Sequence, residues 1–245
     1  MKEDAEALRT NEPKTQAQLR ELYAAYLLSL FQKAHAKGGF NFILTVLRFD
    51  GASFGMWDPM VEAREALEDY SELIREAASD PDKGKRLYRL SILVYCHAIE
   101  MSAPYEILHN VLRCVEGKTY QMRPFSHLIR QRKGKRGVLW NDAIPPSPAS
   151  KIAELRKSCH GMGETKLVEI IESFYRQDIR NAFYHSDYCL DLEQRKLNIP
   201  AMPFAKTISL EEVDGILTRS LSEKKVVQRA EYLRTATSVS AIVRV

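Results

Sequence analysis

The stretch that most constrains this 245-residue chain is Ile179-Arg180-Asn181-Ala182-Phe183-Tyr184-His185-Ser186-Asp187-Tyr188. It places an arginine, an amide and a histidine at the end of an apolar helix, just before a turn. Arginine offers phosphate oxygens a permanent planar fork of donors, and histidine can take or give a proton near neutral pH. The stretch therefore predicts a late helix whose end is suited to phosphate chemistry.

Helical spacing places these polar groups around the end of that helix. Asn181 and His185 are four residues apart and share a face, whereas Arg180 and His185 are five apart and lie on diverging faces. The arginine is long enough to reach round the helix, and a two-fold partner chain would bring two such motifs together. A second interpretation stays open: a surface arginine beside a histidine that caps the helix end, where the helix dipole favours a cation.

The same segment resembles the signature of the HEPN superfamily, all-α proteins that include many RNA-cleaving toxins and antiviral effectors. Their motif is an arginine, a polar residue that is often asparagine, a short and mainly apolar stretch, and a histidine, late in the domain. The resemblance is specific over 179–188 and extends as helix order over about 85–236. It implies an all-α, HEPN-like helical bundle at 81–245, preceded by an N-terminal helical extension at 1–80 that no motif covers.

The resemblance implies an endoribonuclease, a hydrolase-type nuclease that needs neither metal nor cofactor. The RNA 2′-OH would attack its own adjacent phosphate, with His185 as general base or acid. Arg180 would stabilise the developing charge, and Asn181 would hold the phosphate or orient His185. DNA lacks the 2′-OH and would not be cut. The resemblance further implies a homodimeric site, an antitoxin or activator protein as a partner, and a role in stress response, toxin activity or phage defence.

Residues near the motif, in sequence or by helical spacing, are candidates for supporting it. His97 and Glu100 are three apart on an apolar helix, so Glu100 would find its partner in the motif's Arg180 or His185, or the two would pair with each other. Asp187 would modulate His185 electrostatically or be a solvated turn residue. Tyr188 would stack on a base or cover the edge of the core.

A basic segment precedes the motif by about fifty residues and is followed by Trp140. A basic loop beside an aromatic residue is typical of an electrostatic funnel for RNA, but a solvated loop has the same composition. Both interpretations stay open. The candidate RNA-binding residues in this segment are Arg130, Arg132, Lys133, Lys135 and Arg136.

Composition indicates an ordinary globular protein. Hydrophobic residues make up 45% of the chain and charged residues 28%, and the net charge of +4 permits a polyanionic partner without requiring one. The four cysteines (Cys96, Cys114, Cys159 and Cys189) lack CxxC spacing, which argues against zinc and fits reduced thiols. The polar N-terminus has no targeting signature, and the apolar runs are too short to cross a membrane. We therefore expect a cytoplasmic protein.

The hydrophobic pattern predicts a mostly helical chain. Gly38-Gly39 ends the first helix, Asp58-Pro59 opens another, and Ser102-Ala103-Pro104 interrupts a strongly apolar one. Segment 41–54 is ambiguous between helix and strand, 118–148 is expected to be irregular, and 188–200 is expected to form a small β-hairpin. The predicted helices are 15–36, 59–78, 85–101, about 104–115, 149–159, 164–185 and 209–236.

Two functions other than catalysis fit the same residues. In one, the arginine and histidine belong to a non-catalytic module that binds RNA or a nucleotide, or forms a dimer interface. In the other, the chain is a helical interaction protein whose first eighty residues carry the specificity, and the tyrosine-rich face of 15–36 is then an exposed apolar patch. Catalysis instead requires Arg180, Asn181 and His185 to line one solvent-open cleft.

Overall fold

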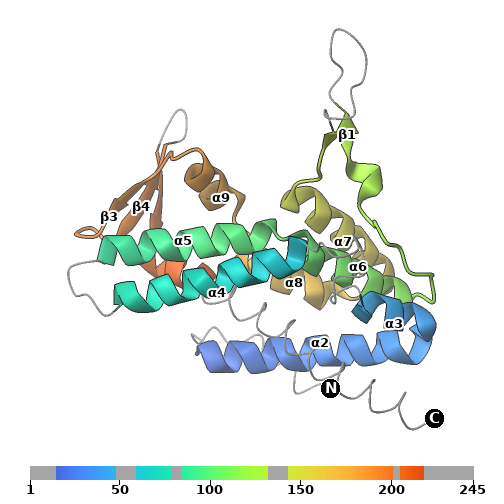
Figure 1. The fold of residues 1–245 in the computed structure, drawn as a ribbon. Helices are drawn as coiled ribbons and strands as arrows, with labels where there is room; N and C mark the ends of the chain where they lie inside the picture. Colours follow the sequence, from blue (N-terminus) through green and yellow to red (C-terminus); the bar gives the residue numbers. More distant parts are fainter. Residues whose placement is uncertain (1–14, 48–58, 79–83, 132–142, 201–204, 218–245) are drawn as a thin grey trace.

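The computed structural model describes residues 15–47, 59–78, 84–131, 143–200 and 205–217, where the chain is mostly helical (Figure 1). None of these helices has both the length and the apolar character needed to cross a bilayer. The predicted all-α fold with a small β-hairpin after the motif helix is confirmed. The helices in chain order are α2 (Gln16–Gly38), α3 (Phe40–Leu47), α4 (Pro59–Ala78), α5 (Gly84–Glu100), α6 (Ser102–Val115), the 3-10 helix η2 (Ser126–Leu128), α7 (Pro148–Met162), α8 (Thr165–Phe174) and α9 (Gln177–Tyr184).

Helix α2 begins and ends where local sequence signals place its termini. The Thr15 hydroxyl accepts from the Gln18 amide at 3.2 Å, and the Gln18 side chain accepts from the Thr15 amide at 2.8 Å, forming a capping box. Gly39 follows the helix with a φ of 50°, a conformation that favours glycine. The predicted helix at 15–36 is confirmed. The ambiguous segment 41–54 is helical as far as residue 47, and its remainder lies outside the described residues.

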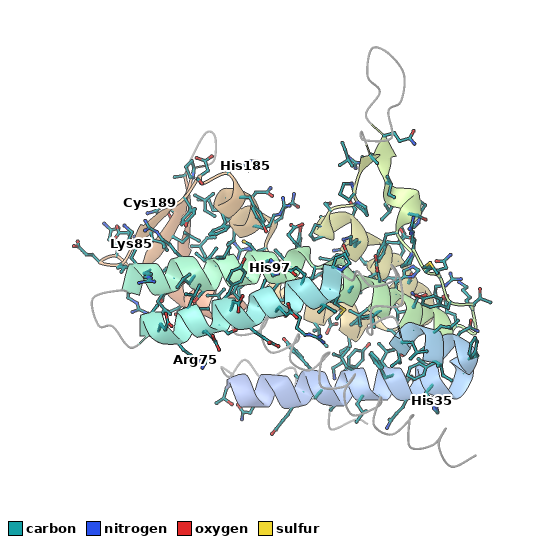
Figure 2. All side chains as sticks on the ribbon, viewed as in Figure 1. His35, Arg75, Lys85, His97, His185 and Cys189 are labelled. Atoms are coloured by element: carbon teal, nitrogen blue, oxygen red, sulfur yellow. The ribbon has the colours of Figure 1, made fainter. Side chains whose placement is uncertain are left out.

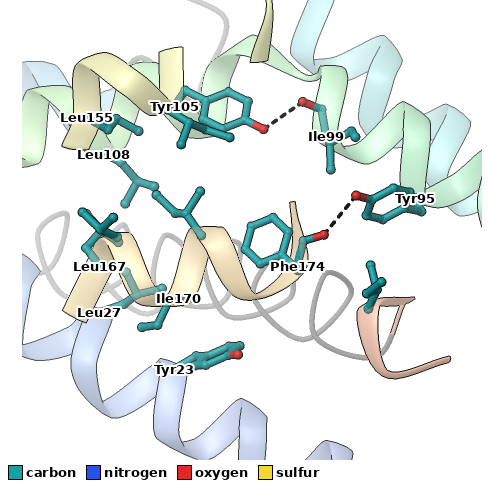
Figure 3. Close-up of a cluster of buried hydrophobic side chains, with 14 of the residues drawn as sticks. Tyr23, Leu27, Tyr95, Ile99, Tyr105, Leu108, Leu155, Leu167, Ile170 and Phe174 are labelled. Atoms are coloured by element: carbon teal, nitrogen blue, oxygen red, sulfur yellow. Dashed lines mark hydrogen bonds between the residues drawn. The ribbon is translucent and has the colours of Figure 1, made fainter. Parts of the chain in front are cut away.

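Helices α5 and α6 are separated by a single residue, Met101. Pro104 lies in the first turn of α6, where amides have no acceptor within the helix, so its missing N–H costs little. The Tyr105 hydroxyl donates to the Ile99 carbonyl at 2.9 Å and spans the break (Figure 3). The predicted interruption of the apolar helix is confirmed. The helices predicted at 59–78 and 149–159 correspond to α4 and α7.

The single motif helix predicted at 164–185 is wrong, because the structure divides it into α8 and α9. Tyr175 and Arg176 between them have extended backbones, with φ/ψ of −76°/116° and −128°/99°. The buried Tyr95 hydroxyl donates to the Phe174 carbonyl at 2.9 Å (Figure 3). The same hydroxyl accepts from the Arg176 amide at 2.7 Å. A hydroxyl from α5 thus replaces helical hydrogen bonds at the break, and no local pattern reports it.

Most of the described buried apolar side chains form one cluster, whose members range from Tyr23 to Leu217 (Figure 3). Tyr23 and Leu27 of α2 belong to the same cluster as Leu108 of α6 and Leu167 of α8. Helix α2 packs along α6, and α4 packs along α5 (Figure 1). The described part of the N-terminal extension therefore shares its core with the rest of the chain.

The hypothesis of an exposed tyrosine-rich face on 15–36 is wrong. Tyr23 is buried, and the half-buried Tyr26 donates its hydroxyl to Glu164 at 3.1 Å. Lys33 forms an ion pair with the same carboxylate at 2.6 Å. This face of α2 is therefore an internal surface that docks against the turn between α7 and α8.

The chain after α9 forms an antiparallel sheet in the order β3 (Cys189–Asp191), β4 (Lys196–Ile199) and β5 (Lys206–Ser209). Leu190 pairs with Leu197 and Leu197 with Ile208, and all three are buried. The hairpin predicted at 188–200 is confirmed, whereas β5 had no signal in the sequence pattern. The last helix, predicted at 209–236, is present at 210–217, and its remainder lies outside the described residues.

Candidate functional site

Arg180 of the motif lies on α9, which packs against α5. Its Nε donates to Glu100 Oε1 at 2.6 Å, and its Nη1 donates to Asn181 Oδ1 at 3.1 Å. Its guanidinium carbon lies 5.0 Å from the centroid of the Tyr184 ring. Burial lowers the pKa of Arg180, but the hydrogen bond to Glu100 together with the electrostatic effects of Glu100, Tyr184 and Tyr175 raises it overall. The guanidinium is therefore a fixed, permanently charged group, and the described residues offer its Nη2 no hydrogen-bond acceptor.

Glu100, the last residue of α5, is the partner that positions Arg180. Of the two interpretations of Glu100, the structure therefore matches the one in which its partner is Arg180 of the motif. His97 does not pair with Glu100: its Nε2 lies 3.1 Å from the Ala63 carbonyl of α4, and its ring packs edge-on against Tyr70 at 5.5 Å. His97 therefore faces α4, and Figure 2 shows it well apart from His185.

His185 caps the C-terminal end of α9 and is exposed to solvent (Figure 2). Its backbone amide donates to the Asn181 carbonyl at 3.0 Å, and the described residues place no hydrogen-bond partner on its ring. Ser186 follows with a φ of 55°, and the Asp187 amide donates to the Ala182 carbonyl at 2.7 Å, which ends the helix. The imidazole is thus held at the helix end by the backbone and is open to an incoming molecule.

The two residues after this turn differ in their surroundings. Asp187 is exposed, beside the helix end. Tyr188 is half-buried, and its ring stacks on Phe183 at 5.9 Å, against the core. Of the two interpretations of Tyr188, the structure therefore matches the one in which it covers the edge of the core.

The basic segment is described only in part. Arg130 is exposed on β1 (Arg130–Gln131), which pairs antiparallel with β2 (Ala143–Ile144). This short pairing lies within the region 118–148, which was expected to be irregular. The other candidate RNA-binding residues lie outside the described residues: Arg132, Lys133, Lys135 and Arg136.

A cavity of about 500 Å³ lies beside Glu100, and sequence reasoning did not find it. We call it the interhelix cavity, because it is lined by the start of α4, the end of α5, the start of α6, the segment 122–129, Pro145, Pro146 and the first turn of α7. Lys151 in its wall is only 4% exposed, and its Nζ donates to Ser102 Oγ at 2.7 Å. In the sequence, the one indication of this cavity is Lys151, a charged residue among the apolar positions of a helix.

The described cysteines comprise three buried thiols and one exposed thiol, Cys189 of β3. Cys96, Cys114 and Cys159 are buried, and burial raises the pKa of Cys96 and of Cys159 to about 12. Both are therefore protonated and weakly nucleophilic. Across the described ranges, no group of three or more His, Cys, Asp or Glu side chains is arranged to hold a metal ion.

Comparisons of the chain with models of protein families, with curated proteins and with solved structures found no match. The resemblance to the HEPN signature therefore rests on residues 179–188.

Proposed function

We propose that this protein is a metal-independent endoribonuclease of HEPN type that acts on RNA in stress response or phage defence. The observation that carries the proposal is the end of α9, where the exposed imidazole of His185 follows the fixed guanidinium of Arg180. The two groups supply a proton carrier and a fixed cation within a turn and a half of helix. The resemblance to the HEPN signature supplies the biological role.

The proposed reaction uses only groups of the RNA and this chain. The 2′-oxygen forms a bond to the adjacent phosphorus, and the bond from phosphorus to the 5′-oxygen breaks. His185 takes the proton from the 2′-OH or gives one to the leaving 5′-oxygen. Arg180 Nη2 donates to the phosphate oxygens, on which negative charge accumulates. The products are a 2′,3′-cyclic phosphate and a 5′-OH.

The two proton transfers favour a homodimer. One imidazole cannot act as base and acid in the same step, and a two-fold axis supplies a second copy of His185. We therefore expect a dimer in size-exclusion chromatography with light scattering. Mixing wild-type chains with an excess of inactive His185→Ala chains is expected to lower the wild-type activity if the two imidazoles share one site, and to leave it unchanged if each chain works alone.

A second candidate function is a non-catalytic module that binds RNA or a nucleotide, or forms a dimer. The ion pair between Arg180 and Glu100 favours this second candidate, because an arginine that is paired with a carboxylate can also stabilise the fold. In this case RNA binding would weaken in Arg180→Ala, and no cleavage would occur under any condition.

The deciding experiment is a cleavage assay with total RNA in excess EDTA, followed by mapping of the cut ends. Wild type is compared with His185→Ala and with His160→Ala. His160 is a matched control because it is also exposed and lies in the last turn of another helix, α7. Loss of a general acid or base lowers rates by about 10²–10⁴-fold.

We expect fragments ending in 2′,3′-cyclic phosphate from wild type and from His160→Ala, and at least a 100-fold slower reaction from His185→Ala. Cleavage that needs added metal, or that persists in His185→Ala, would rule out the mechanism. RNA binding without cleavage by the wild-type dimer would favour the non-catalytic module.

A further inference from the structure

The interhelix cavity has the size and the walls of a small-molecule site. Its volume of about 500 Å³ lies within the range of roughly 300–1,000 Å³ that is usual for ligand pockets. Apolar side chains from three parts of the chain line it, among them Met60 of α4, Met101 before α6, and Met122 and Phe125 of the segment before η2. Thioether and aromatic groups suit the faces of a flat heterocycle.

Among the polar groups in the cavity wall are a buried cation and a carboxylate. Lys151 is 4% exposed and is held by Ser102 Oγ at 2.7 Å. Burial lowers the pKa of Lys151, and the charge of Glu106, which lies one turn into α6 and lines the same cavity, partly opposes this shift. The wall thus offers a ligand both a hydrogen-bond donor and a carboxylate acceptor.

The cavity also touches the motif through one residue. Glu100 lines the cavity and at the same time accepts from Arg180 Nε at 2.6 Å. Arg180, Asn181 and His185 are all absent from the lining of this cavity, so it is not the shared cleft that the motif residues would need for catalysis. A nucleotide whose base enters the cavity would therefore have its phosphate on the side of Glu100 where the guanidinium lies.

We propose that the interhelix cavity binds the guanine base of the RNA nucleotide that lies at the motif, an inference that rests on the proposed ribonuclease function. Guanine presents an acceptor, O6, beside two donors, N1–H and N2–H₂. Lys151 donates to O6 and the Glu106 carboxylate accepts from the two donors. The other bases do not fit, because adenine, cytosine and uracil each place an acceptor beside their donor, and that acceptor repels a carboxylate.

The test is direct binding of guanosine 3′-monophosphate to the full chain by isothermal titration calorimetry, with the adenosine, cytidine and uridine 3′-monophosphates for comparison. Glu106→Gln removes the charge but keeps the shape, and Ser126→Trp places a large side chain at the rim. Ser126 is exposed, so this change is compatible with folding. Gln121→Trp is the matched control, since Gln121 is also exposed on the same segment but does not line the cavity.

We expect wild type to bind the guanosine nucleotide at least tenfold more tightly than the other three. Glu106→Gln and Ser126→Trp should each weaken this binding at least tenfold, and Gln121→Trp should leave it unchanged. Equal binding of the four nucleotides, or unchanged binding in both cavity variants, would overturn the inference.

The two proposals fail separately, because nucleotide binding is measured without RNA cleavage. If the protein binds guanosine 3′-monophosphate in the cavity but cuts no RNA, the base site is supported and the ribonuclease proposal fails. If the protein cuts RNA but the cavity variants do not change guanosine 3′-monophosphate binding, the ribonuclease proposal is supported and the base site fails.

Discussion

At the scale of single residues, the carboxylate of Glu100 determines where the motif arginine lies. The two side chains are 32% and 29% exposed, so their ion pair is neither fully solvated nor fully desolvated. A pair in this setting gains charge-assisted hydrogen bonding without the large desolvation penalty of a deeply buried pair. The contact therefore both orients the guanidinium and adds a modest amount to stability.

Glu100→Gln is expected to lower the free energy of unfolding by about 1 kcal/mol, because the amide keeps the shape of the acceptor but loses its charge. Urea titration followed by circular dichroism measures the change. Glu172→Gln is the control, since its pair with Arg156 is 45% and 47% exposed, and it should cost less than about 0.5 kcal/mol. An equal or larger loss in the control would contradict the assigned role of Glu100.

At the scale of elements, the orientation of α9 depends on contacts at its N-terminal end. Asp178 in the first turn accepts from Arg176 at 2.8 Å, and Arg176 also pairs with Glu212 after β5. Lys206 of β5 donates to the same Asp178 carboxylate. This network joins α9 to the sheet and to the helix at 210–217, so it positions the whole motif.

The same network predicts an acid dependence of stability. Burial raises the pKa of Asp178, but hydrogen bonds from Arg176, Lys206 and the Ile179 amide outweigh burial and hold the pKa well below its ordinary value. The pKa of an aspartate is about 3.9 in the unfolded chain, and the pKa of Asp178 is lower than this in the folded state. The ionised carboxylate therefore stabilises the fold at pH values above about 3.9, and this stability is lost as the pH falls below that value. At pH 7, Asp178→Asn should therefore cost about 1–3 kcal/mol.

Denaturant titrations between pH 7 and pH 2 measure this difference between wild type and Asp178→Asn. The two curves should converge as the pH falls from about 5 to 2, because the wild-type carboxylate then loses its advantage. A difference that stays constant over this range would show that the charge of Asp178 contributes nothing.

The break between α8 and α9 predicts a local effect of Tyr95. Tyr95→Phe removes the group that donates to Phe174 and accepts from Arg176, leaving two backbone groups near the core without that partner. We expect a loss of about 1–3 kcal/mol and faster amide exchange at Arg176, measured by hydrogen–deuterium exchange. Exchange in the middle of α6 is the internal control and should change only as much as global stability does.

At the scale of the whole molecule, one core joins the N-terminal helix to the motif half of the chain. Leu27 of α2 is fully buried in the same cluster as Leu167 of α8. Neighbouring Leu28 on the same helix is 45% exposed. The described chain should therefore unfold as one cooperative unit rather than as an extension and a separate domain.

Leu27→Ala is expected to destabilise the protein by about 2–5 kcal/mol, because it leaves a cavity in the core. Leu28→Ala should cost less than about 1 kcal/mol. Thermal unfolding followed by far-ultraviolet circular dichroism and by calorimetry should show one coincident transition in each variant. A separate early transition for α2 in Leu27→Ala would contradict a shared core.

The sequence by itself determined which segments are helical and where most of them end. Capping residues, glycines and prolines act within one helical turn, so Thr15, Gly39 and Met101 lie at or beside boundaries that local patterns predicted. The sequence also determined the spacing of Arg180, Asn181 and His185, since four or five residues of helix set that spacing whatever surrounds it.

Only the tertiary structure decided the break before α9, the partner of Arg180 and the interhelix cavity. Arg180 and Glu100 are 80 positions apart, Tyr95 and Arg176 are 81 apart, and the cavity is assembled from α4, α5, α6 and α7. Such contacts depend on how apolar faces pack, and helical periodicity specifies which face is buried but not which distant residue it meets. The sequence therefore indicated the chemical groups of the motif, whereas the contacts that position them and the adjoining cavity arise from packing.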